Sequence, residues 1–435
     1  MTNITKNLLK PLELSELVYK LCHDSLISQG FDGFGENNSK IIITLNKEVQ
    51  GLKLRLQCFE VLHLTRLKIY SNGKLIDPKK MVFKSSSLYR DDAKYDVSNL
   101  ALEKGIFHSK REIEPEIEVS FNENINIDKI EVVNFGNRYA YRAFSLCMFY
   151  KEPDNGKYVN FFDNWKLKKP LDLFINNMFT SKNYDEEKLI SLFYVACSFG
   201  DEVKAISLYK KINKIGPKIR TKSVVKIAND LLALNGYGFN QHGFIRPFGL
   251  QSKEQVNNHL NQVVCLMAEL EKEFNIKSTI ASGTLLGIYR DGKLIDHDDD
   301  IDVAYYSNFN DCKDIIKEQN AILLYLKAQG YNCQNTKHVQ IQCSLASGVD
   351  LDLFPAWING DDVTMSPLPT NEITKSDVFP LGVIEFHGFL LPTPNDIHKV
   401  LMVNYGAEYN KSDSNWRFDW SRANQEYIKF IEEKK

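Results

Sequence analysis

The feature that most constrains the fold is an acidic run, Asp296-His297-Asp298-Asp299-Asp300-Ile301-Asp302, in which five of seven residues are aspartate. From Asp300 onward, aspartates alternate with Ile301 and Val303. Successive side chains of a strand point to opposite faces, so this alternation predicts a half-buried strand with Asp300 and Asp302 on one face. Two carboxylates this close repel each other unless a cation lies between them.

Oxygen ligands of this kind favour Mg²⁺ or Mn²⁺, and Mg²⁺ typically combines one or two carboxylates with substrate phosphates. We therefore predict that Asp300 and Asp302 bind a divalent metal ion. Asp296, Asp298 and Asp299 fit a solvated loop instead, because they precede the alternating pattern.

The competing acidic loop is the EF-hand. It needs Gly at its sixth position and Glu at its twelfth. Counting from Asp298, these positions hold Val303 and Phe309, so the EF-hand is excluded.

A second stretch, Gly348-Val349-Asp350-Leu351-Asp352-Leu353, again alternates acidic and apolar residues. It predicts a strand that pairs beside the first and supplies a third acid. Either Asp350 or Asp352 would complete the site. The other is then expected to point to the opposite face and to have its own partner there.

Between a short β-prone run and a helix, the chain has the turn Ser282-Gly283-Thr284. A glycine at such a turn lets the backbone approach a phosphate, and the free N–H groups of a first helical turn attract anions. Ser282, Gly283 and Thr284 are therefore predicted to bind ligand phosphates. Arg290, shortly downstream, is predicted to do the same, whereas Lys293 fits a surface charge nearly as well.

Together these motifs resemble the LicD/fukutin family of phosphotransferases. The resemblance spans about residues 255–411 and is specific, because several spaced motifs agree in order. In one departure, Asp296-His297 replaces the Pro-Trp that the family commonly has. The motifs are Ser282-Gly283-Thr284-Leu285-Leu286-Gly287, Arg290, Asp298-Asp299-Asp300-Ile301-Asp302, Asp352-Leu353-Phe354-Pro355, Phe386-His387-Gly388, Leu391-Pro392-Thr393-Pro394 and Asn404-Tyr405-Gly406-Ala407-Glu408-Tyr409.

The resemblance implies a nucleotidyltransferase-like α/β fold. In this family the aspartates that match Asp300 and Asp302 hold the metal, and the one that matches Asp352 is the third acid. The donor is expected to be CDP-choline, CDP-ribitol or CDP-glycerol. The acceptor is expected to be an oligo- or polysaccharide, which receives the phosphorylated alcohol as CMP leaves. Two alternatives remain: a nucleotidyltransferase of the same fold that releases pyrophosphate, and a glycan-binding protein without catalysis.

The N-terminal part is predicted to be an antiparallel β-sandwich, because short β-prone runs alternate with turn clusters. The predicted strands are Ile41–Leu45, Leu52–Leu56, Leu67–Tyr70, Ile117–Phe121, Ile130–Val133 and Phe144–Tyr150.

Four stretches of this region are informative in their order and spacing: Gly105–Glu112, Pro115–Val119, Ile130–Asn134 and Arg142. With them, residues 85–163 resemble the discoidin-type galactose-binding sandwich, although Glu116 replaces a Trp that this family often has. Such a domain either docks a glycan or is structural, and both readings stay open.

Helical periodicity between residues 171 and 234 predicts a helical connector, and the glycine-rich stretch 236–243 predicts a linker. Ser252 and Gln255 form a capping box ahead of an amphipathic helix. The predicted fold is therefore a multidomain α+β protein. Its parts are an N-terminal antiparallel β-sandwich (1–165), a helical connector (166–235) and a C-terminal nucleotidyltransferase-like α/β domain (236–435).

The formal net charge of −2 argues against a broadly basic, nucleic-acid-binding surface. No apolar run approaches the roughly 20 residues of a membrane span, and no signal peptide is apparent, so a cytoplasmic protein is expected.

The eight cysteines are expected to be buried and reduced, since none forms a CxxC pair. Cys333, His338 and Cys343 suggest zinc, but three ligands at this spacing do not match a usual finger. Core cysteines and an incidental histidine are therefore predicted.

Overall fold

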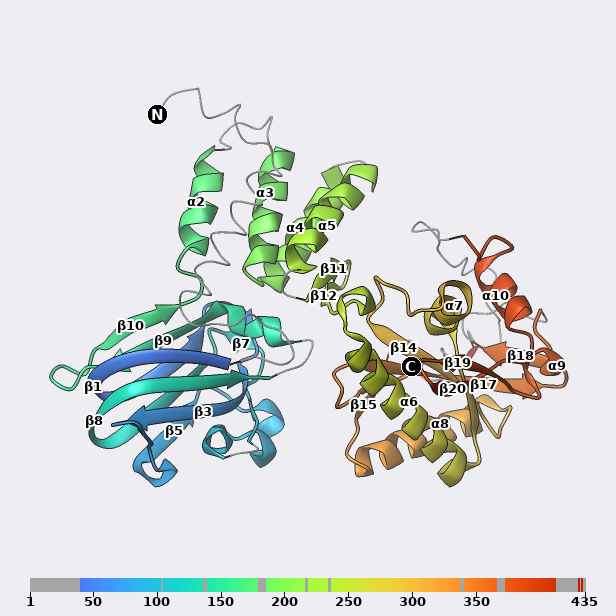
Figure 1. The fold of residues 1–435 in the computed structure, drawn as a ribbon, viewed down its shortest axis with the longest axis horizontal. Helices are drawn as coiled ribbons and strands as arrows, with labels where there is room; N and C mark the ends of the chain where they lie inside the picture. Colours follow the sequence, from blue (N-terminus) through green and yellow to red (C-terminus); the bar gives the residue numbers. More distant parts are fainter. Residues whose placement is uncertain are drawn as a thin grey trace. The chain divides into compact units, whose positions relative to one another are not determined.

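A computed structural model describes residues 40–102, 105–135, 139–178, 185–215, 218–233, 236–336, 340–365, 372–411, 429–430 and 432. The fold is mixed α/β, with several antiparallel sheets. It divides into two compact units, Met1–Ile245 and Arg246–Lys435, which are described separately below (Figure 1). Of the described helices, none has the length and apolar composition needed to cross a membrane.

The first unit is built on two long antiparallel strands, β1 (Lys40–Leu56) and β8 (Glu116–Asn134). Each was predicted as two short strands. In the structure the two pieces form one strand. The pairing of β1 with β8 shifts its register near residues 44–47 and 49–51 and then continues. Such bulges bend a strand without ending it.

The remaining strands flank different halves of this pair. The second half of β1 pairs with β9, while β8 pairs with β5 through residues 117–121 and with β3 through residues 129–134. These strands thus form one continuous antiparallel sheet. The packing of two sheets into a sandwich and the discoidin-type resemblance stay predictions. The other elements are β2 (Phe59–Glu60), β3 (His63–Ser71), β4 (Lys74–Leu75), β5 (Met81–Ser85), β6 (Phe107–His108), β7 (Glu112–Ile113), β9 (Leu146–Lys151), β10 (Tyr158–Asp163), and the 3-10 turns η2 (Pro78–Lys80), η3 (Tyr89–Asp91), η4 (Ala93–Tyr95), η5 (Val97–Ala101) and η6 (Ala140–Ser145).

The predicted helical region forms α2 (Lys168–Met178), α3 (Asp185–Ser198), α4 (Glu202–Ile215) and α5 (Lys218–Ala233). These helices share one apolar core with the sheet. A direct tie is the Trp165 indole, which donates a hydrogen bond of 2.9 Å to the carbonyl of Phe199.

The predicted linker at residues 236–243 is wrong. This stretch contributes to a hairpin, β11 (Gly238–Asn240) and β12 (Gly243–Ile245). The physical reason is its aromatic content, because Tyr237, Phe239 and Phe244 are buried in the core of the first unit.

The second unit contains a mixed sheet in the order β13-β14-β17-β16-β15, with β18 paired to the far end of β17. β14 and β17 are parallel, and the other neighbouring pairs are antiparallel. Figure 1 shows α7 on one side of this sheet and α6 and α8 on the other. The bounds are η8 (Phe248–Leu250), α6 (Lys253–Phe274), β13 (Lys277–Ile280), α7 (Ser282–Asp291), β14 (Asp300–Tyr306), α8 (Cys312–Ala328), β15 (Asn332–Asn335), β16 (Ile341–Ser344), β17 (Asp350–Asn359), β18 (Asp362–Met365), α9 (Lys375–Val378), β19 (Gly382–Phe386), β20 (Phe389–Thr393) and α10 (Ile397–Tyr405).

The start of α6 confirms the predicted capping box. The Ser252 hydroxyl accepts from the amide of Gln255, and the Gln255 side chain accepts from the amide of Ser252. The helix ends at Phe274, and the next residue, Asn275, caps it with a left-handed backbone (φ 54°) that turns the chain into β13. These two ends fix where β13 begins and therefore where the turn at Ser282 lies.

The prediction that all cysteines are reduced is wrong for one pair. Cys333 and Cys343 form a disulfide, because antiparallel pairing of β15 with β16 places them directly opposite each other with Cα atoms 4.1 Å apart. They are therefore not zinc ligands. His338 and Cys22 lie outside the described residues. The free cysteines in the described part are Cys58, Cys147, Cys197, Cys265 and Cys312.

Candidate metal centre

The two predicted acidic strands are neighbours in the sheet. β14 and β17 pair in parallel, with Asp300 beside Asp350 and Asp302 beside Asp352. The expectation that Asp350 and Asp352 point to opposite faces is wrong, because residues two apart in a strand share a face. All four aspartates therefore lie on one face of the sheet.

Asp302 is held against the first turn of α7. The backbone amide of Gly283 donates to Asp302 Oδ2 at 3.0 Å, and the amide of Asp302 donates to the Thr284 hydroxyl at 2.9 Å. The unpaired N–H groups of a helix start stabilise a negative charge placed there. The turn residue Ser282 has a positive φ of 43°, unusual for a residue with a side chain, so the junction between β13 and α7 is under local strain.

Asp298 also belongs to this group, which corrects its prediction as a solvated-loop residue. A Cβ atom at Gly283 would lie 2.8 Å from Asp298 Oδ2 and 3.5 Å from Asp302 Oδ2. The two carboxylates therefore approach the same spot, and only glycine leaves room for them. The signal in the sequence was the two-residue period itself, which extends from Asp302 through Asp300 back to Asp298.

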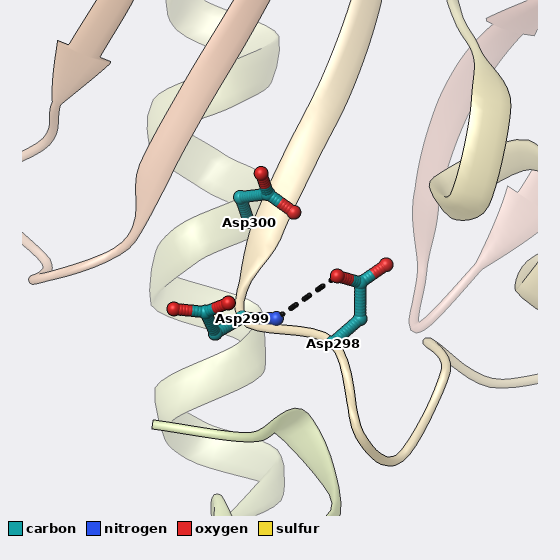
Figure 2. Close-up of side chains that lie close together, drawn as sticks. All are labelled: Asp298, Asp299 and Asp300. Carbon is teal, nitrogen blue, oxygen red and sulfur yellow. Dashed lines mark hydrogen bonds between the residues drawn. The ribbon is translucent and has the colours of Figure 1, made fainter. Parts of the chain in front are cut away.

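Figure 2 shows the acidic turn, which is the stretch from Asp298 to Asp300 at the start of β14. Carboxylate oxygens of Asp298, Asp299 and Asp300 lie within 4.8 Å of one another, and the amide of Asp299 donates to Asp298 Oδ1 at 3.2 Å. The carboxylates of Asp298 and Asp299 point to opposite sides of the chain. Among the described residues, this is the one set of three or more His, Cys, Asp or Glu whose ligand atoms all lie within 4.8 Å of one another.

The crowding changes the acidity of these groups. The pKa of Asp300 is raised well above its usual value, first by burial and then by the charges of Asp302, Asp298 and Asp352. The pKa of Asp302 is also raised by burial and by Asp298 and Asp352, although the Gly283 and Thr284 amides lower it. A buried group of anionic oxygens with too few counter-charges fits a hard divalent cation.

The same electrostatics separate the two candidates for the third acid. The charge of Asp352 raises the pKa of both Asp300 and Asp302, so Asp352 lies close to both carboxylates. The Ser344 hydroxyl donates to Asp350 Oδ1 at 2.8 Å. Asp352 is the better candidate for the third acid, because its charge acts on both Asp300 and Asp302.

Removal of divalent metal should make stability depend on pH. A carboxyl with a raised folded-state pKa binds its proton more tightly folded than unfolded, where the pKa is about 3.9. The stability that this carboxyl contributes is therefore fully present below about pH 4, and it is lost as the pH rises through the raised folded-state pKa. In EDTA, we expect the melting temperature of the wild type to fall with pH more steeply than that of Asp302→Asn. Saturating Mg²⁺ should remove the difference, and equal slopes in EDTA would contradict this account.

Arg290 is engaged by neighbours in the structure. Its guanidinium pairs with both carboxylate oxygens of Asp291, at 2.9 and 2.7 Å, and its Nη1 donates to the carbonyl of Tyr409 at 3.3 Å. It therefore links α7 to the segment after α10. His297 and Asp296 are exposed, and Lys293 pairs with Asp296 at 2.6 Å.

Sequence reasoning missed Tyr405 as a site residue. Its pKa is raised by burial and by the charges of Asp302 and Asp298, and it is lowered by Arg290. The last residue of α10 therefore lies near both the acidic group and Arg290. The signal was its position in Asn404-Tyr405-Gly406, which the resemblance included.

The comparisons with known proteins bear on this unit. Residues 275–396 match the family model described as LicD/FKTN/FKRP, nucleotidyltransferase domain. No curated protein matches the chain. A crystal structure of the lincosamide antibiotic adenylyltransferase LnuA with bound lincomycin is 12% identical, and the alignment covers 42% of this chain and 96% of that chain with a TM-score of 0.25. At these values the likeness supports no conclusion. The acidic motifs thus lie in a segment that matches the LicD/FKTN/FKRP nucleotidyltransferase domain, which confirms the resemblance found in the sequence and indicates a transferase.

Proposed function

We propose that the second unit transfers a phosphorylated small alcohol (choline, ribitol or glycerol phosphate) from a CDP-activated donor to a glycan acceptor. The observation that carries the proposal is the single acidic face formed by Asp300, Asp302 and Asp352 beside the first turn of α7. This face lies within the segment that matches the family model. Its products would serve the modification of surface polysaccharides or other glycans.

Asp300, Asp302 and Asp352 would hold Mg²⁺ or Mn²⁺, which would neutralise the donor phosphates when bound. The first turn of α7, from Ser282 to Thr284, donates its Gly283 amide to Asp302. It would therefore hold this metal ligand in place and border the donor phosphates beside it. An acceptor hydroxyl attacks the phosphorus that carries the alcohol, and a new P–O bond forms as the bond to CMP breaks. The hydroxyl proton passes to a carboxylate of the acidic face.

The first alternative is nucleotidyl transfer, with a nucleoside monophosphate moved and pyrophosphate released. The matching family model is described as a nucleotidyltransferase domain, and this description is the observation in favour of nucleotidyl transfer. A non-catalytic glycan-binding protein is the second alternative, and the retention of the whole acidic face argues against it.

The deciding experiment incubates the full chain with Mg²⁺, a glycan acceptor panel, and CDP-choline, CDP-ribitol or CDP-glycerol. Release of CMP supports the proposal. Release of pyrophosphate from nucleoside triphosphates, with none of the CDP-alcohols consumed, supports nucleotidyl transfer. Glycan binding without turnover of any nucleotide supports the binding protein.

Arg290→Ala is expected to weaken CDP-alcohol binding, because a charged hydrogen-bonding group typically contributes about 1.5–3 kcal/mol. Asp291→Asn is the matched variant, since it removes the salt-bridge partner and keeps the guanidinium. Donor affinity by calorimetry should fall for Arg290→Ala and hold for Asp291→Asn. If both variants lose melting temperature equally and keep their affinity for the CDP-alcohol, Arg290 has only a structural role, linking α7 to Tyr409.

A further inference from the structure

The third acid has a neighbour that no motif singled out. Gln340 immediately precedes β16, and its side-chain Nε2 donates to Asp352 Oδ2 at 3.0 Å. Asp352 itself is buried, with 7% of its surface exposed. A hydrogen bond to one oxygen of a buried carboxylate fixes the rotation of that carboxylate and therefore where its other oxygen points.

The orientation of the Gln340 amide is itself determined. The Thr336 hydroxyl donates to Gln340 Oε1 at 2.7 Å, and the amide of Thr336 donates to the carbonyl of Gln340 at 3.0 Å. A glutamine has one accepting and one donating end. Because a carboxylate only accepts, the donating end of Gln340 faces Asp352, and the Thr336 hydroxyl satisfies the accepting end.

Thr336 follows β15 and Gln340 precedes β16, and two contacts hold these paired strands in place. The disulfide between Cys333 and Cys343 joins its two strands. Asn335 Nδ2, next to Thr336, donates to Asn320 Oδ1 on α8 at 3.1 Å. The hydrogen bonds from Thr336 to Gln340 and from Gln340 to Asp352 therefore lie on strands whose positions are fixed. A group that orients a metal ligand requires such rigid support.

We propose that Gln340 is a positioning residue for Asp352, which it holds in the rotation that presents a carboxylate oxygen to the metal-binding group with Asp300 and Asp302. The inference rests on the proposed metal role of Asp352. It adds Gln340 and Thr336 to the residues on which that role depends. Neither residue touches the donor or acceptor in this account; both act through Asp352.

The test measures Mn²⁺ binding to the full chain by electron paramagnetic resonance, without any nucleotide. Residues that orient a metal ligand typically account for 10–100-fold in affinity, so Gln340→Met should weaken Mn²⁺ binding about 10-fold or more. Thr336→Val should weaken it less. The double variant should match Gln340→Met, because Thr336 acts through the same amide. Gln334→Met is the control, since Gln334 is exposed on β15 and its side chain donates to Gln342 at 3.4 Å.

Two results would overturn the inference. One is wild-type Mn²⁺ affinity in folded Gln340→Met, and the other is an equal loss in Gln334→Met. A further check uses Asp352→Asn, in which Gln340→Met should cause no additional loss. If the wild type releases no CMP but Gln340→Met still weakens Mn²⁺ binding, only the proposed reaction fails. If CMP is released and Mn²⁺ binding by Gln340→Met is unchanged, only the role of Gln340 fails.

Discussion

Asp300→Asn and Asp302→Asn should each abolish turnover and leave the protein folded. Asparagine keeps the shape and one accepting oxygen of aspartate, so packing around β14 should survive. It removes the anionic oxygen that a hard cation needs. Loss of a ligand should therefore exceed the roughly 10–100-fold that is typical of residues behind a ligand. CMP release from the active CDP-alcohol, measured across a Mg²⁺ titration, reports this loss.

The same substitutions should raise the melting temperature in EDTA. Burial and neighbouring carboxylates raise the pKa of both residues, so removal of one negative charge relieves repulsion when no cation is present. With Mg²⁺ and a CDP-alcohol, the order should reverse, because only the wild type gains stability by binding them. Near-normal turnover with unchanged melting temperatures would show that these are ordinary solvated aspartates.

The local chemistry of this site could be predicted from the sequence because it depends on short-range periodicity. Alternation of aspartate with Ile301 and Val303 predicts which carboxylates share a face, and the structure has both apolar residues fully buried. The pairing of β14 with β17, in contrast, joins residues that are far apart in the sequence. The strands are parallel and separated by α8 and a hairpin, so their register depends on the packing of the whole unit.

Other parts of the fold escaped prediction for similar reasons. The bulges that join the pieces of β1 depend on the partner strand, which lies far away in sequence. The disulfide depends on the antiparallel register that places Cys333 opposite Cys343. Gln340 belongs to no local pattern, because its contact with Asp352 joins the residue before β16 to β17.

Asp298→Asn is expected to reduce turnover far more than Asp299→Asn. Asp298 Oδ2 is close enough to Gly283 that a Cβ atom there would lie 2.8 Å away, and Asp302 Oδ2 borders the same space. Burial raises the pKa of Asp298, and its charge raises the pKa of Asp300 and Asp302. Asp299 is the matched control, because it is the adjacent aspartate and its carboxylate points to the other side of the chain (Figure 2).

The comparison separates two kinds of contribution. If Asp298 shares the cation with Asp302, Asp298→Asn should raise the Mg²⁺ concentration needed for half-maximal turnover about 10-fold or more, with Asp299→Asn near the wild type. Direct Mn²⁺ binding should change by the same factor, since no substrate is needed for this effect. Asp299 also carries one oxygen within 4.8 Å of Asp298 and Asp300, so the opposite ranking has a clear meaning. A larger loss in Asp299→Asn would place the metal at the turn shown in Figure 2, outside the sheet face that joins Asp302 to Asp352.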